Sequence, residues 1–179
     1  VTLQAALPVE QPFLLLRIEL ENRGPAPLLI DRITFLKTDL PQTRLPGLAG
    51  AQVDPVFFSN GWQSWNWTGA YGPQDRFRRT RLGLLTAPMR VNSGTPHPKL
   101  PGMFGSDLFA VLGDRASRRG LLAGFLSQNQ HFGSLEADIR GEAPRLGMWA
   151  NGDGARLDPG SRMETDWACL HFLHLDAPD

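Results

Sequence analysis

The sequence predicts an all-β protein, an antiparallel β-sandwich with one long loop-rich insert. Two observations predict this class. The 19 glycines and 15 prolines interrupt the chain at short intervals, so few windows are long enough for a helix of three turns. Several of the remaining segments alternate apolar and polar residues with the period of two that is typical of a strand with one buried face. A chain of 179 residues is the size of one domain, and we expect residues 1–179 to form a single β-sandwich domain.

Two strands are expected near the N-terminus. In the first, Leu14, Leu16, Ile18 and Leu20 alternate with Leu15, Arg17, Glu19 and Glu21. The turn sequence NRGPAP then leads into the apolar segment LLIDRITFLK. Because Asn, Gly and Pro favour turns, these two strands are expected to pair as a hairpin.

Further strands are expected at residues 107–112, 120–127 and 135–140, each bounded by Gly, Pro or Asn. In the segment RLGMWANGDGARL, Asn151 and Gly152 stand between two extended runs. Asn-Gly is the strongest short hairpin signal, because both residues tolerate positive φ, so a hairpin is expected there. Residues 163–175 are expected to form one long closing strand.

The stretch from Thr38 to Gly105 has a different texture, because prolines and glycines repeatedly interrupt the apolar pattern. It is the long loop-rich insert of the predicted sandwich. Such stretches are uncommon inside compact domains, and those that occur usually carry function or dock on a neighbour.

Composition excludes several classes of partner. Eighteen basic residues balance 18 acidic ones, so no field steers the protein toward nucleic acid or an anionic membrane. The N-terminus lacks a signal-peptide pattern, and no apolar run approaches the roughly 18 residues of a membrane helix. A single cysteine, Cys169, favours the cytoplasm. The chain starts without Met and stops at HLDAPD, which indicates a piece of a longer polypeptide.

The most unusual segment is FFSNGWQSWNWTGAYG, residues 57–72, which holds three of the five tryptophans. Its candidate substrate-binding or partner-facing residues are Asn60, Trp62, Gln63, Ser64, Trp65 and Trp67. Indole faces beside amides and hydroxyls suit a sugar, whose C–H faces stack on the ring while its hydroxyls form hydrogen bonds. The alternative is structural, with the tryptophans closing the open end of the sandwich or packing on another domain.

No catalytic, metal or cofactor site is predicted. The four histidines lack metal-ligand spacing, Cys169 has no histidine motif beside it, and no phosphate-binding or nucleophile-elbow motif occurs. Glycoside hydrolysis needs two carboxylates at a defined separation. The available acids show no pattern that selects two, and we expect them on the surface: Asp107, Asp114, Glu136, Asp138, Asp153 and Asp158.

The segment FFSNGWQSWNWTG resembles the N-G-x-Q-S-W-S signature in the N-terminal domain of glycoside hydrolase family 36, the melibiase-like alpha-galactosidases. The stretch GSDLFAVLGDRASRRGLLAGFLSQNQHFGSLEADI is similar to two strands of that domain followed by a glutamine and a phenylalanine. LDPGSRMETDWACLHF is similar to the segment that precedes the linker into the catalytic barrel. The resemblance covers about residues 1–176.

This resemblance implies a galactose-mutarotase-like β-supersandwich, followed in the full enzyme by a (β/α)8 barrel. The barrel would carry both catalytic aspartates of a retaining mechanism, and neither would lie in this chain. Family members are often homo-oligomers, and their sandwich loops pack near the mouth of the galactose pocket. The residues that would face this mouth are Asn60, Gly61, Trp62, Gln63, Ser64 and Trp65. Asn66 departs from the usual serine, and Trp67 is not a fixed part of the motif.

Three hypotheses follow. In the first, the chain is a non-catalytic domain that packs on the barrel and shapes its substrate entrance, with a galactoside as the carbohydrate and no cofactor. In the second, it is a stand-alone carbohydrate-binding module that uses the tryptophans as a platform. In the third, it is a small hydrolase or epimerase with its own acid/base pair. Under the first, the tryptophans are expected to be under-buried in the isolated domain, with Gln63 and Ser64 fixing the loop.

Overall fold

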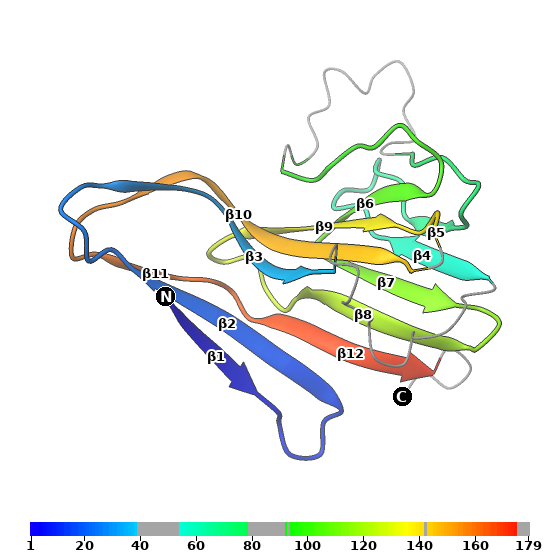
Figure 1. Ribbon diagram of the computed structural model, residues 1–179, viewed down its shortest axis with the longest axis horizontal. Coiled ribbons are helices and arrows are strands. Elements are labelled where there is room, and N and C mark those ends of the chain that lie inside the picture. Colours follow the sequence, from blue (N-terminus) through cyan, green and yellow to red (C-terminus); the bar gives the residue numbers. More distant parts are fainter. Residues whose placement is uncertain (39–53, 79–91, 93, 142, 175–179) are drawn as a thin grey trace.

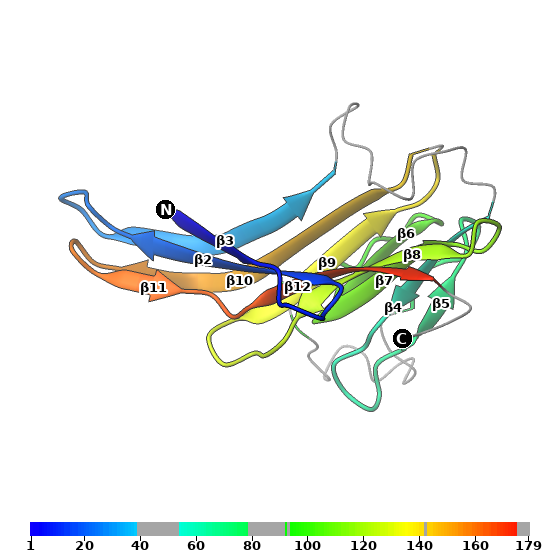
Figure 2. The same ribbon diagram turned by 90° about the horizontal axis from the view of Figure 1, so that it is seen from below.

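The computed structural model describes residues 1–38, 54–78, 92, 94–141 and 143–174. Within these residues the regular secondary structure is entirely β, and the strands form two antiparallel sheets (Figures 1 and 2). The predicted class, an antiparallel β-sandwich, is therefore confirmed. In the same ranges, no helix has the length and apolarity needed to cross a bilayer.

The two sheets differ in size. In the described part of the chain, the larger sheet has eight strands, and seven of them lie in the order β1 (Thr2–Ala6), β2 (Phe13–Glu21), β12 (Ala168–His174), β8 (Arg119–Phe125), β7 (Phe109–Asp114), β4 (Pro55–Ser59) and β5 (Gly69–Tyr71). The eighth, β11 (Arg162–Glu164), pairs with β2. The smaller sheet has the order β3 (Leu28–Lys37), β10 (Arg145–Leu157), β9 (Phe132–Asp138) and β6 (Met103–Asp107).

The main core lies between the two sheets and is built from both. Phe57 of β4 stacks on Phe104 of β6 with ring centroids 5.7 Å apart, and Tyr71 stacks on the same ring at 4.9 Å. Leu112 and Met148 are fully buried in the same cluster. Each such side chain contributes about 2 kcal/mol to stability through apolar burial. This packing holds the two sheets against each other, and the loops described below start from these sheets.

The predicted strands at 14–21 and 28–37 exist as β2 and β3, but the predicted hairpin between them is wrong. β2 pairs with β1, β11 and β12, whereas β3 pairs with β10 in the other sheet. The turn sequence therefore makes a corner at which the chain changes sheets. A second corner, between β10 and β11, lies beside it at the same end of the molecule (Figures 1 and 2).

Asn22 explains why the chain turns a corner here. Its Nδ2 donates to the carbonyls of Ala26 (2.8 Å) and Leu157 (2.9 Å), while its Oδ1 accepts from the Gly24 N–H (3.0 Å). Its own carbonyl accepts from the N–H of Gly160 in the second corner (2.7 Å). A buried asparagine that satisfies both corners replaces the ladder bonds that a hairpin would have made.

The hairpin expected at Asn151 and Gly152 is also wrong, because β10 continues through this segment. Asn151 pairs with Arg32 and Ala155 with Ile30, so three residues of β10 stand opposite the single Asp31 of β3. We call residues 152–154 the β10 bulge. Such insertions bend a strand without ending it.

The backbone and the side chain of Asn151 both favour a bulge over a turn. The residues with positive φ are Asp153 (51°) and Gly154 (74°), whereas an Asn-Gly turn would need positive φ at Asn151 and Gly152. The Asn151 side chain is buried and accepts from Trp149 Nε1 at 3.0 Å. It also donates to the Phe132 carbonyl at 2.9 Å. These bonds hold Asn151 within the sheet.

Two other predicted strands are interrupted. The one expected at 107–112 is divided by Leu108, whose positive φ of 66° sends Asp107 into the smaller sheet and Phe109 into the larger. The closing strand is divided at residues 165–167 into β11 and β12, and Leu175 lies outside the described residues. The strands predicted at 120–127 and 135–140 correspond to β8 and β9.

The predicted insert from Thr38 to Gly105 is not a pure loop. β4, β5 and the start of β6 fall inside it, and the first two extend the edge of the larger sheet. The sequence missed β4 because Pro55 stands at its first position, where a strand tolerates the missing N–H donor. Residues 39–53, 79–91 and 93 of this stretch lie outside the described part of the chain.

Candidate functional site

The tryptophan loop, defined as residues 60–68, connects two strands at the edge of the larger sheet. Its ends are held together because β4 and β5 pair antiparallel, with Ser59 opposite Gly69. The buried Ser59 hydroxyl also donates to the Gly105 carbonyl at 2.7 Å. The loop therefore starts from a base that is tied to both sheets.

Asn60 anchors the first residue of the loop to the end of β6. Its Nδ2 donates to the Asp107 carbonyl at 2.8 Å, and its carbonyl accepts from the Asp107 N–H at 2.9 Å. Its own N–H donates to Ser106 Oγ at 2.8 Å. Asn60, a predicted site residue, is thus a structural anchor whose amide is engaged within the protein.

The Asp107 carboxylate holds the tryptophan loop in place through hydrogen bonds. Sequence reasoning missed Asp107 as a site residue. It is 6% exposed, and its carboxylate accepts from the Trp62 N–H at 3.1 Å and from Asn66 Nδ2 at 3.5 Å. The Thr95 hydroxyl donates to its other oxygen at 2.6 Å. No sequence signal distinguished this acid from its neighbours, since its partners come from two other parts of the chain, the tryptophan loop and the segment that holds Thr95.

Close packing inside the loop explains Gly61 and Asn66. A Cβ at Gly61 would lie 2.5 Å from the Cβ of Asn66, so only glycine fits. The Gly61 N–H donates to Thr68 Oγ1 at 2.9 Å, which closes the loop on itself. Asn66, where the resembling family has serine, is 3% exposed and therefore belongs to the interior of the loop.

The three tryptophans have different environments. Trp62 is 41% exposed and meets Phe132 edge to face, with centroids 4.9 Å apart. Trp65 is half-buried. Trp67 is also half-buried, packs against the main core and carries the Arg78 guanidinium 5.4 Å from its ring centroid. None of the three is fully buried, as expected, but Trp62 alone among them is exposed.

The prediction that Gln63 and Ser64 fix the loop is confirmed only for the backbone of Gln63. Neither side chain hydrogen-bonds to any described residue, and Ser64 is exposed. Gln63 contributes through its backbone, whose carbonyl accepts from the Asn66 N–H at 2.8 Å. The side chains of Asn60, Thr68 and Asp107 take the role that was expected of them.

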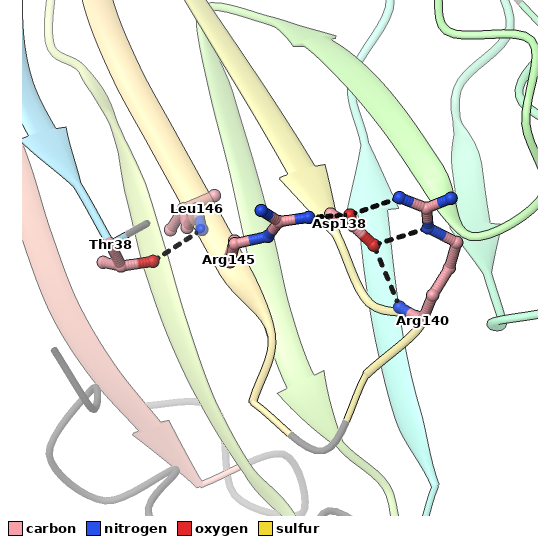
Figure 3. A network of polar contacts seen from close by, with 5 residues as sticks. All are labelled: Thr38, Asp138, Arg140, Arg145 and Leu146. Carbon is pink, nitrogen blue, oxygen red and sulfur yellow. Dashed lines mark hydrogen bonds and ion pairs between the residues drawn. The ribbon is translucent and has the colours of Figure 1, made fainter. Parts of the chain in front are cut away.

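The expectation that the acids lie on the surface is wrong for Asp107, Asp114 and Asp138, which are all buried. Asp138 stands at the end of β9 between two arginines (Figure 3). Arg140 donates to its two oxygens at 2.7 and 2.9 Å, and Arg145 donates to one of them. The hydrogen bonds from Arg140 outweigh the effect of burial and hold the pKa of the Asp138 carboxyl well below its usual value.

A cavity of about 300 Å³ adjoins this ion cluster at the smaller sheet. Met103, Phe104 and Pro98 line one part of it, and Asp138 and Arg145 the other. Thr38, which directly follows β3, is bonded to β10: its Oγ1 accepts a hydrogen bond from the Leu146 N–H at 2.8 Å (Figure 3). Because Asp138 stays ionised, it suits an ion-pair role rather than that of a proton donor.

The structure offers no metal site in the ranges it describes, since no three His, Cys, Asp or Glu side chains there are placed to hold an ion. Cys169 is buried, and burial raises the pKa of its thiol. A protonated thiol in an apolar setting is a poor nucleophile.

The searches against protein-family models and against curated proteins give no match. Among solved structures, the chain resembles the alpha-galactosidase from Lactobacillus brevis with a TM-score of 0.55 and 16% sequence identity. The likeness covers 97% of this chain and 21% of that chain, so this chain spans about a fifth of the length of that enzyme. At this identity the comparison establishes the fold alone: the chain has the β-sandwich fold of one part of a much longer alpha-galactosidase chain.

Proposed function

We propose that this chain is the non-catalytic N-terminal β-sandwich domain of an alpha-galactosidase-like glycoside hydrolase. It packs on the catalytic (β/α)8 barrel of the same polypeptide and shapes the substrate entrance. The observation that carries the proposal is the fold likeness, which covers nearly all of this chain but only 21% of the Lactobacillus brevis enzyme. The remaining length of such an enzyme holds room for a barrel. A homo-oligomer and a cytoplasmic location belong to the same proposal.

The tryptophan loop supports a role at an entrance. Its backbone is fixed by Asn60 and Asp107, yet Trp62 presents 41% of its surface. A rigid loop that exposes one indole is suited to contact a barrel loop or the face of a galactoside. In this role Trp62 and Trp65 contribute apolar surface, while Gln63 and Ser64 keep side chains available for polar contacts at the mouth.

The buried acids support a non-catalytic role. Asp107 is engaged by Trp62 and Thr95, and Asp138 by two arginines. A glycosidase acid/base pair needs one carboxyl that holds a proton near neutral pH and a second one that is ionised. The strongly lowered pKa of Asp138 is the opposite of what a general acid requires.

The test compares the full polypeptide with this chain alone. The reading frame beyond Asp179 is expected to encode a barrel with paired aspartates at strand ends. The full protein should release nitrophenol from nitrophenyl alpha-galactoside, and residues 1–179 alone should not. In the full protein, Trp62→Ala should raise KM about fivefold, the equivalent of ~1 kcal/mol of aromatic contact. Leu29→Ala, an exposed apolar residue of β3, is the matched control.

A stand-alone carbohydrate-binding module is the second candidate, favoured by the exposure of Trp62. Its test is calorimetric titration of residues 1–179 with melibiose. Binding that Trp62→Ala abolishes, together with a stop codon after Asp179, would replace the first function by this one. Hydrolysis by the isolated chain would contradict both.

A further inference from the structure

A polar groove of about 480 Å³ lies beside the tryptophan loop and is separate from its candidate residues. One wall is the segment 128–131, which precedes β9, and the other is β11. The β10 bulge and Asn151 form the third side. The groove is therefore lined by β11 of the larger sheet and by residues of β9 and β10 of the smaller one.

The floor of the groove is rigid. The Asp166 carboxylate accepts from the N–H groups of Asn129 (3.2 Å), Gln130 (2.8 Å) and His131 (3.0 Å). The His131 ring then spans the gap between the sheets, with its nitrogens 3.1 and 3.3 Å from the carbonyl oxygens of Asn151 and Glu164. These contacts fix the segment 128–131, so a ligand would meet a surface that is already ordered.

Three polar side chains of the groove are available to a ligand. Gln128, Gln130 and Asp153 are exposed, and within the described residues their side chains make no hydrogen bond or ion pair. Asp153 has a positive φ of 51°, an uncommon conformation for a residue other than glycine, and it stands in a bulge. Both features recur at binding sites, where they redirect a side chain.

Two charged residues of the groove, Arg162 and Glu164, form ion pairs with residues outside it. Arg162 pairs with Glu21 at 3.1 Å and with Glu19 at 3.6 Å, while Glu164 pairs with Arg17 at 3.2 Å. Two amides and one carboxylate remain. This set can both donate and accept hydrogen bonds, which matches the hydroxyls of a neutral sugar better than an anion. A metal ion fits less well, since no cluster of three ligands occurs among the described residues.

Phe132 connects the groove to the tryptophan loop. It lines the groove, and its ring meets that of the exposed Trp62 edge to face at 4.9 Å. An extended ligand can therefore contact the indole of Trp62 with one sugar unit and the polar groove with another. Apolar rings at one end and amides at the other are the usual composition of a carbohydrate site.

We propose that this groove is an oligosaccharide-binding subsite in which Asp153, Gln128 and Gln130 hydrogen-bond to sugar hydroxyls. The choice of an alpha-galactoside as ligand rests on the proposed function; the site itself rests on the groove. The subsite would hold the sugar units of a longer substrate that extend away from Trp62.

The experiment is a titration of ¹⁵N-labelled residues 1–179 with raffinose, with cellobiose as a second probe. Raffinose is expected to shift the backbone amides of residues 128–132 and 151–155. Asp153→Asn keeps a residue that tolerates positive φ, and it should weaken raffinose binding about tenfold through loss of hydrogen bonds to a charged acceptor. Gln130→Ala should also weaken binding. Asp158→Asn, which alters an exposed ion pair with Arg156, is the matched control and should bind as the wild type does.

Three outcomes would overturn the inference. One is the absence of amide shifts with either sugar. Another is a set of shifts confined to residues 60–68. The third is unchanged affinity in Asp153→Asn and Gln130→Ala, whose folding the same spectra report. Equal binding of cellobiose would retain the subsite but remove its preference for alpha-galactosides. None of these results affects the barrel-packing role, which depends on the reading frame and on the activity of the full polypeptide.

Discussion

The tryptophan loop and the β9–β10 connection each depend on a buried aspartate, but the two aspartates have different partners. Asp107 is 6% exposed and binds a backbone N–H, an amide and a hydroxyl. Asp138 is 9% exposed and binds two arginines whose side chains are 40% and 54% exposed. One carboxylate is thus satisfied by uncharged donors inside the protein, and the other by cations at the surface.

A buried carboxylate can therefore hold a loop in place through uncharged donors alone, without a positively charged partner. Neutral donors from the tryptophan loop and from Thr95 fix the positions of these two segments relative to Asp107, because each bond requires a particular geometry. Long arginine side chains reach a carboxylate from many positions, and water and salt weaken the pairs they form. The tryptophan loop should therefore be more sensitive to small changes than the β9–β10 connection.

The largest expected effect is that of Asp107→Ala. It leaves the Trp62 N–H and the Thr95 hydroxyl without their acceptor, and the free energy of unfolding should fall by about 3 kcal/mol. Asp138→Ala should cost only about 1 kcal/mol, because its partners remain hydrated. Urea denaturation of both variants measures the contrast. Asp107→Asn, which retains one acceptor oxygen, should fall between wild type and Asp107→Ala; equal losses in the two alanine variants would remove the distinction.

Glycine substitutions compare the same two regions through packing. Gly61→Ala should destabilise the protein by about 2 kcal/mol, because its Cβ would lie 2.5 Å from that of Asn66. Gly141→Ala is the matched control in the β9–β10 connection, since a Cβ there meets nothing within 4 Å. Thermal unfolding should show a lower Tm for the first variant and an unchanged or slightly higher Tm for the second. A tolerated Gly61→Ala would mean that the loop can relax.

The ion cluster should appear in the pH dependence of stability. The pKa of Asp138 is lowered in the folded protein, so its pairing stabilises the fold above the unfolded pKa and is lost as pH falls below about 4. The difference in unfolding free energy between wild type and Asp138→Asn should be about 1 kcal/mol at pH 7 and smaller at pH 3. Added salt should reduce it as well. A difference that grows on acidification would contradict the assignment.

The smallest effect on stability is expected for Trp62→Ala, at under ~1 kcal/mol, because the indole is exposed and loses mainly its contact with Phe132. Trp67→Ala, by contrast, removes packing on the main core and should cost about 2 kcal/mol. Chemical denaturation of the Trp62→Ala and Trp67→Ala variants shows which of the two indoles stabilises the fold. A large loss for Trp62→Ala would assign that residue to the core.

The sequence was most informative where one local pattern determined the outcome. Alternation of apolar residues predicted β2 and β9, and glycine and proline spacing predicted an all-β class. The predictions failed where contacts with residues distant in the sequence determined the local structure. Asn22 and Asn151 are residue types that favour turns, but the side chain of each donates a hydrogen bond to a carbonyl far along the chain. Local turn chemistry cannot register such bonds.

The candidate site shows the same division. The exposure of Trp62 agrees with the expectation that a crowded aromatic segment serves a surface. The support beneath it was not foreseen, since no pattern in the sequence connects Asp107, Ser106 or Thr95 with the tryptophan loop. The bulge was misread for a related reason: NGDG permits positive φ at several positions, and only pairing with β3 determines which are used.

The two corners joined by Asn22 have a consequence for how the protein is made. β2 pairs with β11 and β12 as well as with β1, and β3 pairs with β10, so strands near one end of this chain pair with strands near the other. The hydrogen bond from the Asn22 amide to the Leu157 carbonyl can form only after Leu157, 135 positions later, has been made. Contacts of such sequence separation form slowly and leave strand edges open meanwhile. Until the later strands are made, β2 and β3 therefore lack the partners that cover their edges in the folded protein.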